Sequence, residues 1–486
     1  MSLSSALSSA VSGLTSSARR AEITSDNIAN ALTPGFAKRR IEVASDVLDG
    51  RGVGVRFVGV DRITDVAATA SRRYMESEFG RAAISHGVSE RITVLLGAAG
   101  QPGAMANRFA EFEAALVAAA SEPGGQSHLD NGVSRAKELA NDLNRISREN
   151  AELRQYADQQ ISHKVDRINI NLQEIKRLNT EMTHRQASFN GTNSLEDTRQ
   201  KLIDEISEAI PIKVIKRQNG QVALFTTEGA TLIDGLVSEL EFTPTMMITH
   251  DMTLASGALS GLTLNGDPVP IGDGAGVMDG GSLGALFAAR DIDVPKFNSQ
   301  MDALARDLIE RFQDPAVDTT LAVGDAGIFT DGGVAFDPLN EVGLAGRIEI
   351  NDLINPTEGG ESWRLRDGLN AAGIGEVGDN TILRNLEAAM QGPQSATAAI
   401  GIFGSMSAAS FAAEITSQHA FNTSVLEERS AYANGQLSLL KETESGRTGV
   451  DTDEELQNLL EIEKAYAANA RVVSTIDELL SRLLEI

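Results

Sequence analysis

Histidine, aspartate and glycine are the residue types of this sequence that could hold a metal ion, a phosphate or a reacting group. The six histidines do not form the His-Glu-x-x-His pattern of a zinc helix; they are His86, His128, His163, His184, His250 and His419. The glycine-rich stretches 50–54 and 272–276 lack a Gly-x-Gly-x-x-Gly turn, and no Walker loop or Gly-x-Ser-x-Gly elbow is present. The aspartate-rich turns 273–279 and 325–331 lack the alternating oxygen ligands of a calcium loop. The sequence therefore predicts no catalytic residue, no cofactor and no metal site, and a protein that is not an enzyme.

The composition narrows the function classes further. The 486 residues include no cysteine, 4% aromatic residues, and 42 basic against 68 acidic side chains, a net charge of −26. Without cysteine there is no disulfide, thiol nucleophile or thiolate metal site. The acidic balance argues against a nucleic-acid partner, and the basic cluster 38–40 is too short to reverse that. No secretory signal or membrane span is evident, so composition alone predicts a cytoplasmic protein without a membrane partner.

The hydrophobic pattern predicts helices at both ends of the chain and short strands between them, an α+β multidomain fold. Predicted helices cover about 1–32, 67–121 with a break at 102–103, 129–185, 283–312 and 405–486. A strand is predicted at 53–60, and Asn219-Gly220 marks a hairpin. Strand-like runs and turns fill much of the middle. The predicted domains are 1–65 with 441–486, then 66–209 with 401–440, and an inserted β-rich domain at 210–400.

The two ends of the chain carry apolar stripes that predict a coiled-coil arm. A heptad runs through the C-terminal helix, with Asn469 as its one polar member, which can fix the register. Thr452 and Glu455 fit a capping box with Thr452 as N-cap. Residues 1–40 carry a net charge of +3 and residues 441–486 a net charge of −6, which favours pairing. The predicted assembly interface consists of Leu3, Leu7, Leu14, Asn27, Ile28, Asn30, Leu459, Ile462, Tyr466, Asn469, Val473, Ile476, Leu480 and Leu483.

Terminal and internal motifs carry a resemblance to a known family. The segment 25–36 is similar to the Asn-Ile-Ala-Asn-x-x-Thr-x-Gly-[Phe/Tyr] signature of bacterial flagellar axial proteins. The segments 449–455 and 465–473 resemble the C-terminal end of the hook-associated members of that family. Residues 280–291 resemble their Gly-Gly-x-Leu-Gly-x-Leu-x-x-x-Arg-Asp segment. Residues 189–199, which include Phe189-Asn190-Gly191 and Leu195-x-Asp197-x-Arg199, resemble their post-helix loop.

The resemblance implies a structural protein that joins the flagellar hook to the filament. In such proteins the terminal helices form an inner coiled-coil layer, a long-helix bundle surrounds it, and the central insert faces outward. The implied partners are a ring of identical subunits, the hook protein, a second junction protein towards the flagellin of the filament, and an export chaperone. The implied location is the extracellular flagellum, reached by type III export without a cleaved signal peptide. This replaces the cytoplasmic prediction from composition.

Three alternatives stay open at this level. Another axial protein, of the hook or distal rod, is disfavoured by the long helix at 129–185 and by the segment 280–291. A filamentous extracellular adhesin would use the β-rich insert to bind a ligand. A cell-wall hydrolase fused to axial ends would need paired carboxylates or a nucleophile within 210–400, and no such pattern is evident there.

Overall fold

The computed structural model describes residues 3–33, 35–48, 51–98, 100–187, 191–395 and 400–484. The chain divides into two compact units. The first comprises Met1–Phe79, Asp166–Glu239 and Ala433–Ile486, and the second comprises Gly80–Val165 and Leu240–Tyr432. Three long helices contribute residues to both units: α2 (Val66–Leu96), α4 (Gln126–Ala187) and α10 (Ala408–Thr448).

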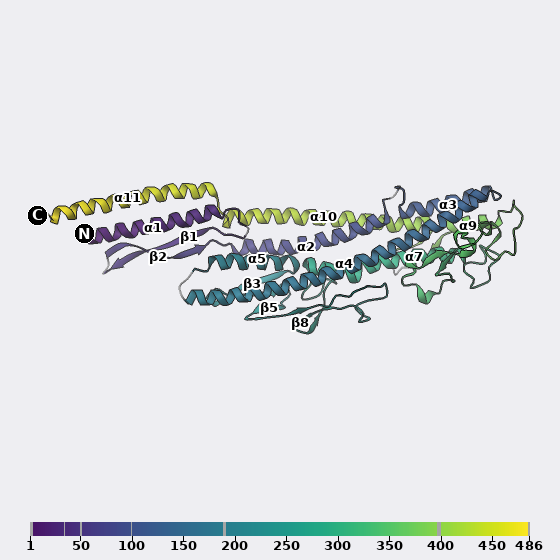
Figure 1. The fold of residues 1–486 in the computed structure, drawn as a ribbon, viewed down its shortest axis with the longest axis horizontal. Helices are drawn as coiled ribbons and strands as arrows, with labels where there is room; N and C mark the ends of the chain where they lie inside the picture. The colour runs from purple at the N-terminus through teal and green to yellow at the C-terminus, as the bar shows by residue number, and fades with distance from the viewer. Residues whose placement is uncertain are drawn as a thin grey trace. The chain divides into compact units, whose positions relative to one another are not determined.

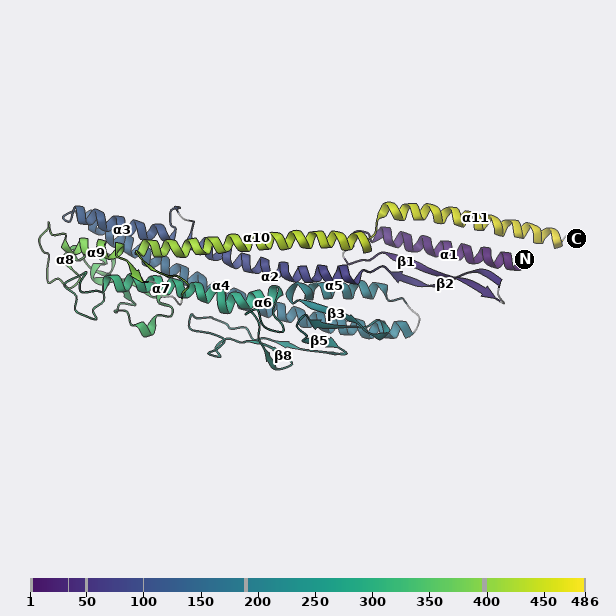
Figure 2. The same ribbon diagram turned by 180° about the vertical axis from the view of Figure 1, so that it is seen from behind.

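The first unit contains both ends of the chain, which form what we call the terminal arm. The arm consists of α1 (Leu3–Ala29), β1 (Arg39–Leu48), β2 (Arg51–Arg62) and α11 (Thr452–Leu484). The two strands pair antiparallel from Arg39↔Arg62 to Leu48↔Arg51. Helix α1 lies between α11 on one side and this hairpin on the other, as both views show (Figures 1 and 2). Residues 449–451 separate α10 from α11.

The remainder of the first unit is a helix-and-sheet body. It contains α5 (Asn193–Ala209) and a four-stranded sheet of order β3-β4-β5-β6, with strands at Ile212–Lys216, Val222–Thr226, Thr231–Asp234 and Leu236–Val237. The turn between β3 and β4 is the predicted hairpin, and Asn219 there has a positive φ of 54°. Asparagine tolerates that left-handed conformation better than most residues.

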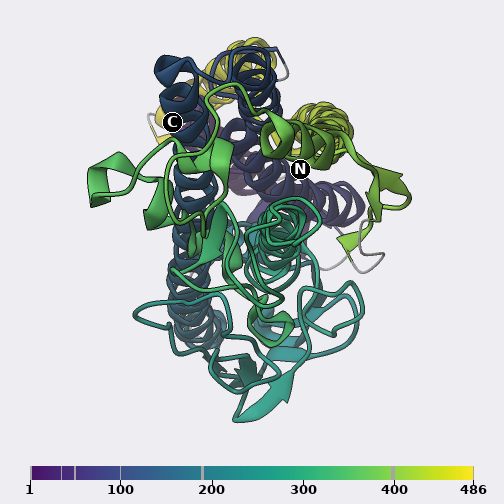
Figure 3. The ribbon, with the colours of Figure 1, turned by 90° about the vertical axis from the view of Figure 1, so that its right-hand side faces the viewer.

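The second unit combines helices with short strands and turns. Its own helices are α3 (Met105–Ser121), α6 (Gly281–Ala288), α7 (Val294–Phe312), α8 (Arg364–Asp367) and α9 (Thr381–Gln391), with a π-helical turn at Ala289–Asp293. Its strands are β7 (Leu240–Glu241), β8 (Leu262–Leu264), β9 (Asp267–Val269), β10 (Phe329–Asp331), β11 (Ile348–Ile350), β12 (Gln394–Ser395) and β13 (Ser405–Met406). Figure 3 views this unit end-on, with green turn-rich segments around the helices.

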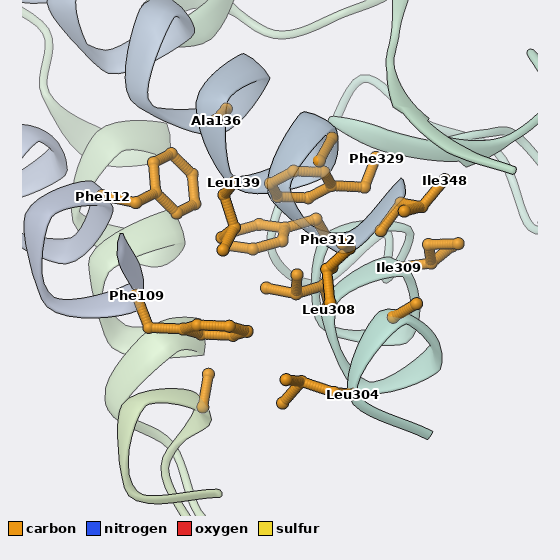
Figure 4. Close-up of a cluster of buried hydrophobic side chains, with 14 of the residues drawn as sticks. Phe109, Phe112, Ala136, Leu139, Leu304, Leu308, Ile309, Phe312, Phe329 and Ile348 are labelled. Carbon is orange, nitrogen blue, oxygen red and sulfur yellow. The ribbon is translucent and has the colours of Figure 1, made fainter. Parts of the chain in front are cut away.

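Aromatic rings form the centre of the second unit's core. The rings of Phe112, Phe312 and Phe329 come from α3, α7 and β10, and their centroids lie 5.6–5.8 Å apart. Figure 4 shows these rings among aliphatic side chains such as Leu139 and Leu308. Phe112 meets the other two rings edge-to-face, an arrangement that adds to the stabilisation that burial provides.

The structure confirms a mostly helical chain whose long terminal helices pack together, with small β-sheets in its central region. The predicted helix break at 102–103 lies between α2 and α3, and the predicted strand 53–60 lies within β2. Strand β1 was not predicted, because bulges at Glu42/Val43 and Asp46/Val47 interrupt its alternation. Residues 195–199 were interpreted as part of a loop but belong to α5. The three-domain division stays a prediction.

Candidate assembly interface of the terminal arm

Helices α1 and α11 contact each other and carry most of the predicted interface residues, which are unequally buried. Ile476 is 5% exposed, whereas Leu480 and Leu483 near the chain end are 37% and 59% exposed. Tyr466 is also exposed. The half-buried members are Leu3, Leu7, Leu14, Ile28, Leu459, Ile462, Asn469 and Val473. Two helices alone therefore cover the predicted stripe only in part.

Gly13 and Asn469 meet where the two helices approach each other. A Cβ placed on Gly13 would lie 2.7 Å from Nδ2 and 2.9 Å from Cγ of Asn469. Those distances are too short for real atoms, so only glycine fits beneath this amide without a shift. The polar position in the C-terminal heptad thus sits opposite a matching small residue, as expected for a position that sets register.

Asn27 fixes the junction between the end of α1, the start of β1 and the start of α11. It is 1% exposed, and its Nδ2 donates to the carbonyl of Arg39 at 2.9 Å and to Oε2 of Glu455 at 3.0 Å. The N–H of Arg39 donates back to Oδ1 of Asn27 at 2.9 Å. Asn30 instead donates to Asp26 within the last turn of α1. The first Asn of the motif therefore connects separate segments, and the second acts locally.

Glu455 makes an ion pair rather than completing the predicted capping box. The N-cap of α11 is Asp451, whose Oδ1 accepts from the N–H groups of Asp453 and Glu454 at 2.9 and 3.2 Å. The prediction of Thr452 as N-cap was wrong by one residue, because the aspartate before it satisfies the free N–H groups. This leaves the Glu455 carboxylate free to accept from Asn27 and to pair with Lys38 at 3.0 Å.

Two residues of the basic cluster 38–40, Lys38 and Arg39, form ion pairs that join segments of the arm. We call these ion pairs, together with the hydrogen bonds of Asn27, the polar clamps of the arm. Lys38 pairs with Glu454 at 2.9 Å as well as with Glu455, and its N–H donates to the carbonyl of Thr448. Partial burial lowers the pKa of Lys38, but the hydrogen bonds to the two glutamates outweigh burial and raise the pKa overall. Arg39 pairs with Asp26 at 2.7 Å and with Asp197 at 3.0 Å.

A second polar cluster lies where α2, α5 and α10 meet in the first unit. Arg72 pairs with Glu76 at 2.7 Å, with Asp204 at 2.8 Å and with Glu444. Burial lowers the pKa of Arg72, but the surrounding carboxylates outweigh it and raise the pKa overall. Arg447 pairs with Asp65 at 2.6 Å. These contacts hold the last turns of α10, from which the arm continues.

Several apolar side chains of the arm stay exposed to a large extent. Along α11, Leu456, Leu460 and Leu479 are 51%, 58% and 45% exposed. The hairpin adds Val55 and Val58, which are also exposed. Leu456 and Leu460 lie one turn apart on α11, and neighbouring exposed apolar residues on a folded protein mark surfaces that contact another molecule. The arm therefore has the chemical character of an interface rather than of a catalytic site.

Sequence reasoning predicted the two terminal helices of the arm but missed residues whose contacts join its segments. Gly13, Lys38, Arg39 and Asp197 were not among the predicted interface residues, although three of them lie within or beside the family motifs. Pro34, Phe189 and Asn190, which also belong to those motifs, lie outside the described residues. The part of the chain that the structure describes holds no cluster of three potential metal ligands. No helix among those residues is both long and apolar enough to span a bilayer.

Comparisons with known proteins identify the family. Residues 90–320 match the model of the flagellar hook-associated protein FlgK helical domain. Residues 447–486 match the C-terminal model of the flagellar basal body rod FlgEFG proteins, and residues 7–36 match that of flagella basal body rod proteins. Flagellar hook-associated protein 1 of Bacillus subtilis (strain 168) is 22% identical over 497 residues, which cover 95% of this chain and 94% of the relative. The Escherichia coli (strain K12) protein of the same name is 21% identical over 562 residues, covering all of both chains.

The chain belongs to the flagellar hook-associated protein 1 family. Members of this axial protein family are structural, so the chain is a component of the flagellar hook–filament junction and not an enzyme. Its location is the extracellular flagellum. This assignment replaces the three alternatives left open by the sequence. The solved structure of the flagellar hook junction protein FlgK from Burkholderia pseudomallei matches 54% of this chain and 47% of its own, with 18% identity and a TM-score of 0.43.

Proposed function

We propose that the chain builds the hook–filament junction by packing its terminal arm against the arms of neighbouring copies in a ring. The ring would contact hook protein on one side and, on the other, a second junction protein that leads to flagellin. The observation that carries this proposal is the incomplete burial of the α1–α11 stripe together with the exposed leucines of α11. All of these residues belong to the arm, whose segments are already joined by the contacts of Asn27, Lys38 and Glu455.

The energetics favour completion of the arm by neighbours. Burying apolar surface is worth roughly 25 cal/mol per Å², so a fully exposed leucine gains about 1.5–3 kcal/mol on burial and a half-exposed leucine about half of that. Leu456, Leu460, Leu479 and Leu483 are each about half exposed in the single chain. Repeated around a ring, these contributions would hold subunits together without any new folding of the second unit.

In this proposal, buried polar residues of the arm fix its geometry, and exposed leucines contact the neighbouring subunits. The buried contacts of Asn27, Glu455 and Lys38 hold α1, β1 and α11 in one geometry. The exposed leucines then meet neighbouring subunits. Because the polar contacts are satisfied within the chain, assembly need not break them, and the arm can add subunits as a preformed piece.

The proposed route to this location is type III export of the unfolded chain, with a chaperone covering the exposed arm residues beforehand. The composition supports this route. A chain without cysteine cannot form cross-links during passage, and aromatic residues make up only 4% of it. The long helices would form again after export, when packing against neighbours removes their apolar stripes from water.

The test is complementation of a strain that lacks this protein with the double variant Leu456→Asp and Leu460→Asp. Both side chains are more than half exposed, so the purified variant should keep its circular dichroism and its melting temperature. The cells should carry hooks without filaments and release flagellin into the medium, as electron microscopy and immunoblotting would show. Leu339→Asp in the second unit is the matched control, because Leu339 is 92% exposed and lies outside the arm.

Three results would contradict the proposal. Filaments of normal number and length on cells with the double variant would show that this face of α11 contacts no neighbour. An equal loss of filaments with Leu339→Asp would show that the effect comes from any exposed charge rather than from the arm. A large fall in melting temperature of the double variant would show that the leucines are needed within the single chain.

A further inference from the structure

A cavity of about 580 Å³ lies in the helix-and-sheet body of the first unit. Its wall comes from the end of β2, the first turns of α2, one face of α5 and strand β3. Apolar walls are contributed by Val60, Val66, Tyr74, Ile203 and Val214. The volume is within the range of cavities that hold small organic molecules in proteins. All of these residues belong to one unit, so the cavity is complete within it.

Arg199 of α5 lines this cavity with donors that the protein does not use. The side chain is 92% buried, since its exposed fraction is 8%. Its Nη1 donates to Oδ1 of Asn179 at 2.8 Å and to the carbonyl of Gly220 at 2.7 Å. Its Nε and Nη2 make no hydrogen bond to a described residue, and no carboxylate among those residues pairs with it. Burial lowers the pKa of Arg199 to about 10; the nearby carboxylate of Glu196 opposes this shift, and the cations Arg62 and Arg73 add to it.

The charges around the cavity are opposite to the charge of the whole chain. The lining contains five basic and two acidic side chains, whereas the protein carries a net charge of −26. Arg62 is already paired with Asp197 at 2.7 Å, and Arg73 with Asp204 at 2.7 Å. Nη2 of Arg73 is nevertheless buried without a hydrogen-bond partner. The cavity therefore combines apolar walls with a net positive lining and a buried guanidinium, Arg199, that no carboxylate of the described residues bonds directly.

We propose that this cavity binds an organic anion that carries a carboxylate on an apolar body, with the carboxylate held by Arg199. A guanidinium offers paired donors whose spacing matches the two oxygens of a carboxylate. The apolar walls beside it fit a hydrocarbon group and disfavour a compact, fully hydrated ion such as inorganic phosphate. The source is either a free organic acid or an Asp or Glu side chain next to an apolar residue on another chain. The site shares the end of β2 with the arm but contains no residue of α1 or α11, so it is separate from the exposed leucines proposed to act at the junction.

The experiment is isothermal titration calorimetry of the full-length protein with four probes. Hexanoate represents the free acid, and acetyl-Leu-Glu-amide presents the same chemistry on a peptide with blocked ends. Hexanamide keeps the apolar body without the charge, and inorganic phosphate keeps charge without the apolar body. The proposal expects binding of hexanoate, of the dipeptide or of both at millimolar concentration, with hexanamide and phosphate at least about tenfold weaker. The stronger of the first two identifies the source.

Variants connect the binding to the cavity. Arg199→Met should weaken binding by about tenfold or more, since it removes the charged donors. Because it also removes the bonds to Asn179 and Gly220, a second variant blocks the space instead. Val66→Trp places a larger side chain at the cavity wall from a residue that is 60% exposed, and it should reduce binding while the protein stays folded. Arg217→Met removes an exposed arginine of the same unit that pairs with Asp234, and it should bind like the natural protein.

Three outcomes would overturn the proposal. They are the absence of binding of both carboxylates, equal binding of hexanoate and hexanamide, and unchanged binding in both Arg199→Met and Val66→Trp. If Arg199 only clamped the β3–β4 turn, Arg199→Met would lower the melting temperature while the natural protein bound neither probe.

Discussion

The terminal arm and the core of the second unit bury different kinds of side chain. In the second unit the buried side chains include Phe109, Phe112, Phe297, Phe312 and Phe329, each with no exposed surface. In the described part of the arm the buried apolar residues are Ala10, Ala37 and Ile476. The second unit is therefore stabilised by its own packing. In the arm, hydrogen bonds and ion pairs join the segments, and much of the apolar surface stays exposed.

The largest expected effect comes from opening the aromatic core. Phe312→Ala should lower the free energy of unfolding of the second unit by about 3–5 kcal/mol, because it removes a ring that contacts Phe112 and Phe329. The only tryptophan, Trp363, lies in this unit, so its fluorescence reports the transition. Leu460→Ala in the arm should leave that transition within about 0.5 kcal/mol of the natural protein. If Phe312→Ala and Leu460→Ala changed the free energy of this transition equally, the second unit would not be stabilised by its own packing as the comparison states.

Acid should destabilise the second unit through His419. Burial, and then the nearby Lys296, lower the pKa of this histidine from 6.5 to about 4. Its Nε2 lies 2.7 Å from Oε1 of Gln300, and its ring contacts Phe297. Between pH 6.5 and 4 the unfolded chain binds a proton that the folded chain does not, so this contribution to stability is complete above pH 6.5 and is lost as the pH falls.

The expected loss is up to about 3 kcal/mol at pH 4, followed by the fluorescence of Trp363. His419→Gln retains a side-chain donor for Gln300 and should flatten this part of the pH profile. A variant profile that falls as steeply as that of the natural protein would assign the acid sensitivity to other groups.

The sequence predicted the elements of this fold far better than the contacts that join them. The apolar repeats of α1, α4 and α11 are local, so periodicity was enough to place them. Glu455, by contrast, bonds to Asn27, which is 428 residues away in the chain. No local pattern predicts that pairing, and the same glutamate fits a capping box when only its neighbours are considered. The cavity at Arg199 likewise depends on segments brought together by folding.

The next largest expected effect comes from removing the buried hydrogen bonds of Asn27 in the arm. Asn27→Ala leaves the Arg39 N–H and one oxygen of Glu455 without their buried partner, at a cost of about 2 kcal/mol. Asn30→Ala is the matched control, because its bonds stay within the last turn of α1 and the loop that follows. Hydrogen exchange followed by mass spectrometry should show faster exchange in α1 and the start of α11 for the first variant only. Equal exchange in the two variants would show that Asn27 does not connect these segments.

The smallest expected effect tests the closest contact between α1 and α11. Alanine stabilises a helix by about 1 kcal/mol relative to glycine when nothing opposes its methyl group. Gly435→Ala meets no atom within 4 Å and should gain about that amount in α10. Gly13→Ala has the same propensity gain, but its methyl group collides with the amide of Asn469. The crowding should outweigh the gain and leave the arm about 1 kcal/mol less stable, with faster exchange in α1 and α11. A double variant tests whether the amide causes the effect. Combining Gly13→Ala with Asn469→Ala should restore slow hydrogen exchange in α1 and α11, since the second change removes the colliding amide. If Gly13→Ala alone slowed exchange as Gly435→Ala does in its helix, the amide would move aside freely, and the arm would have no fixed register at this position.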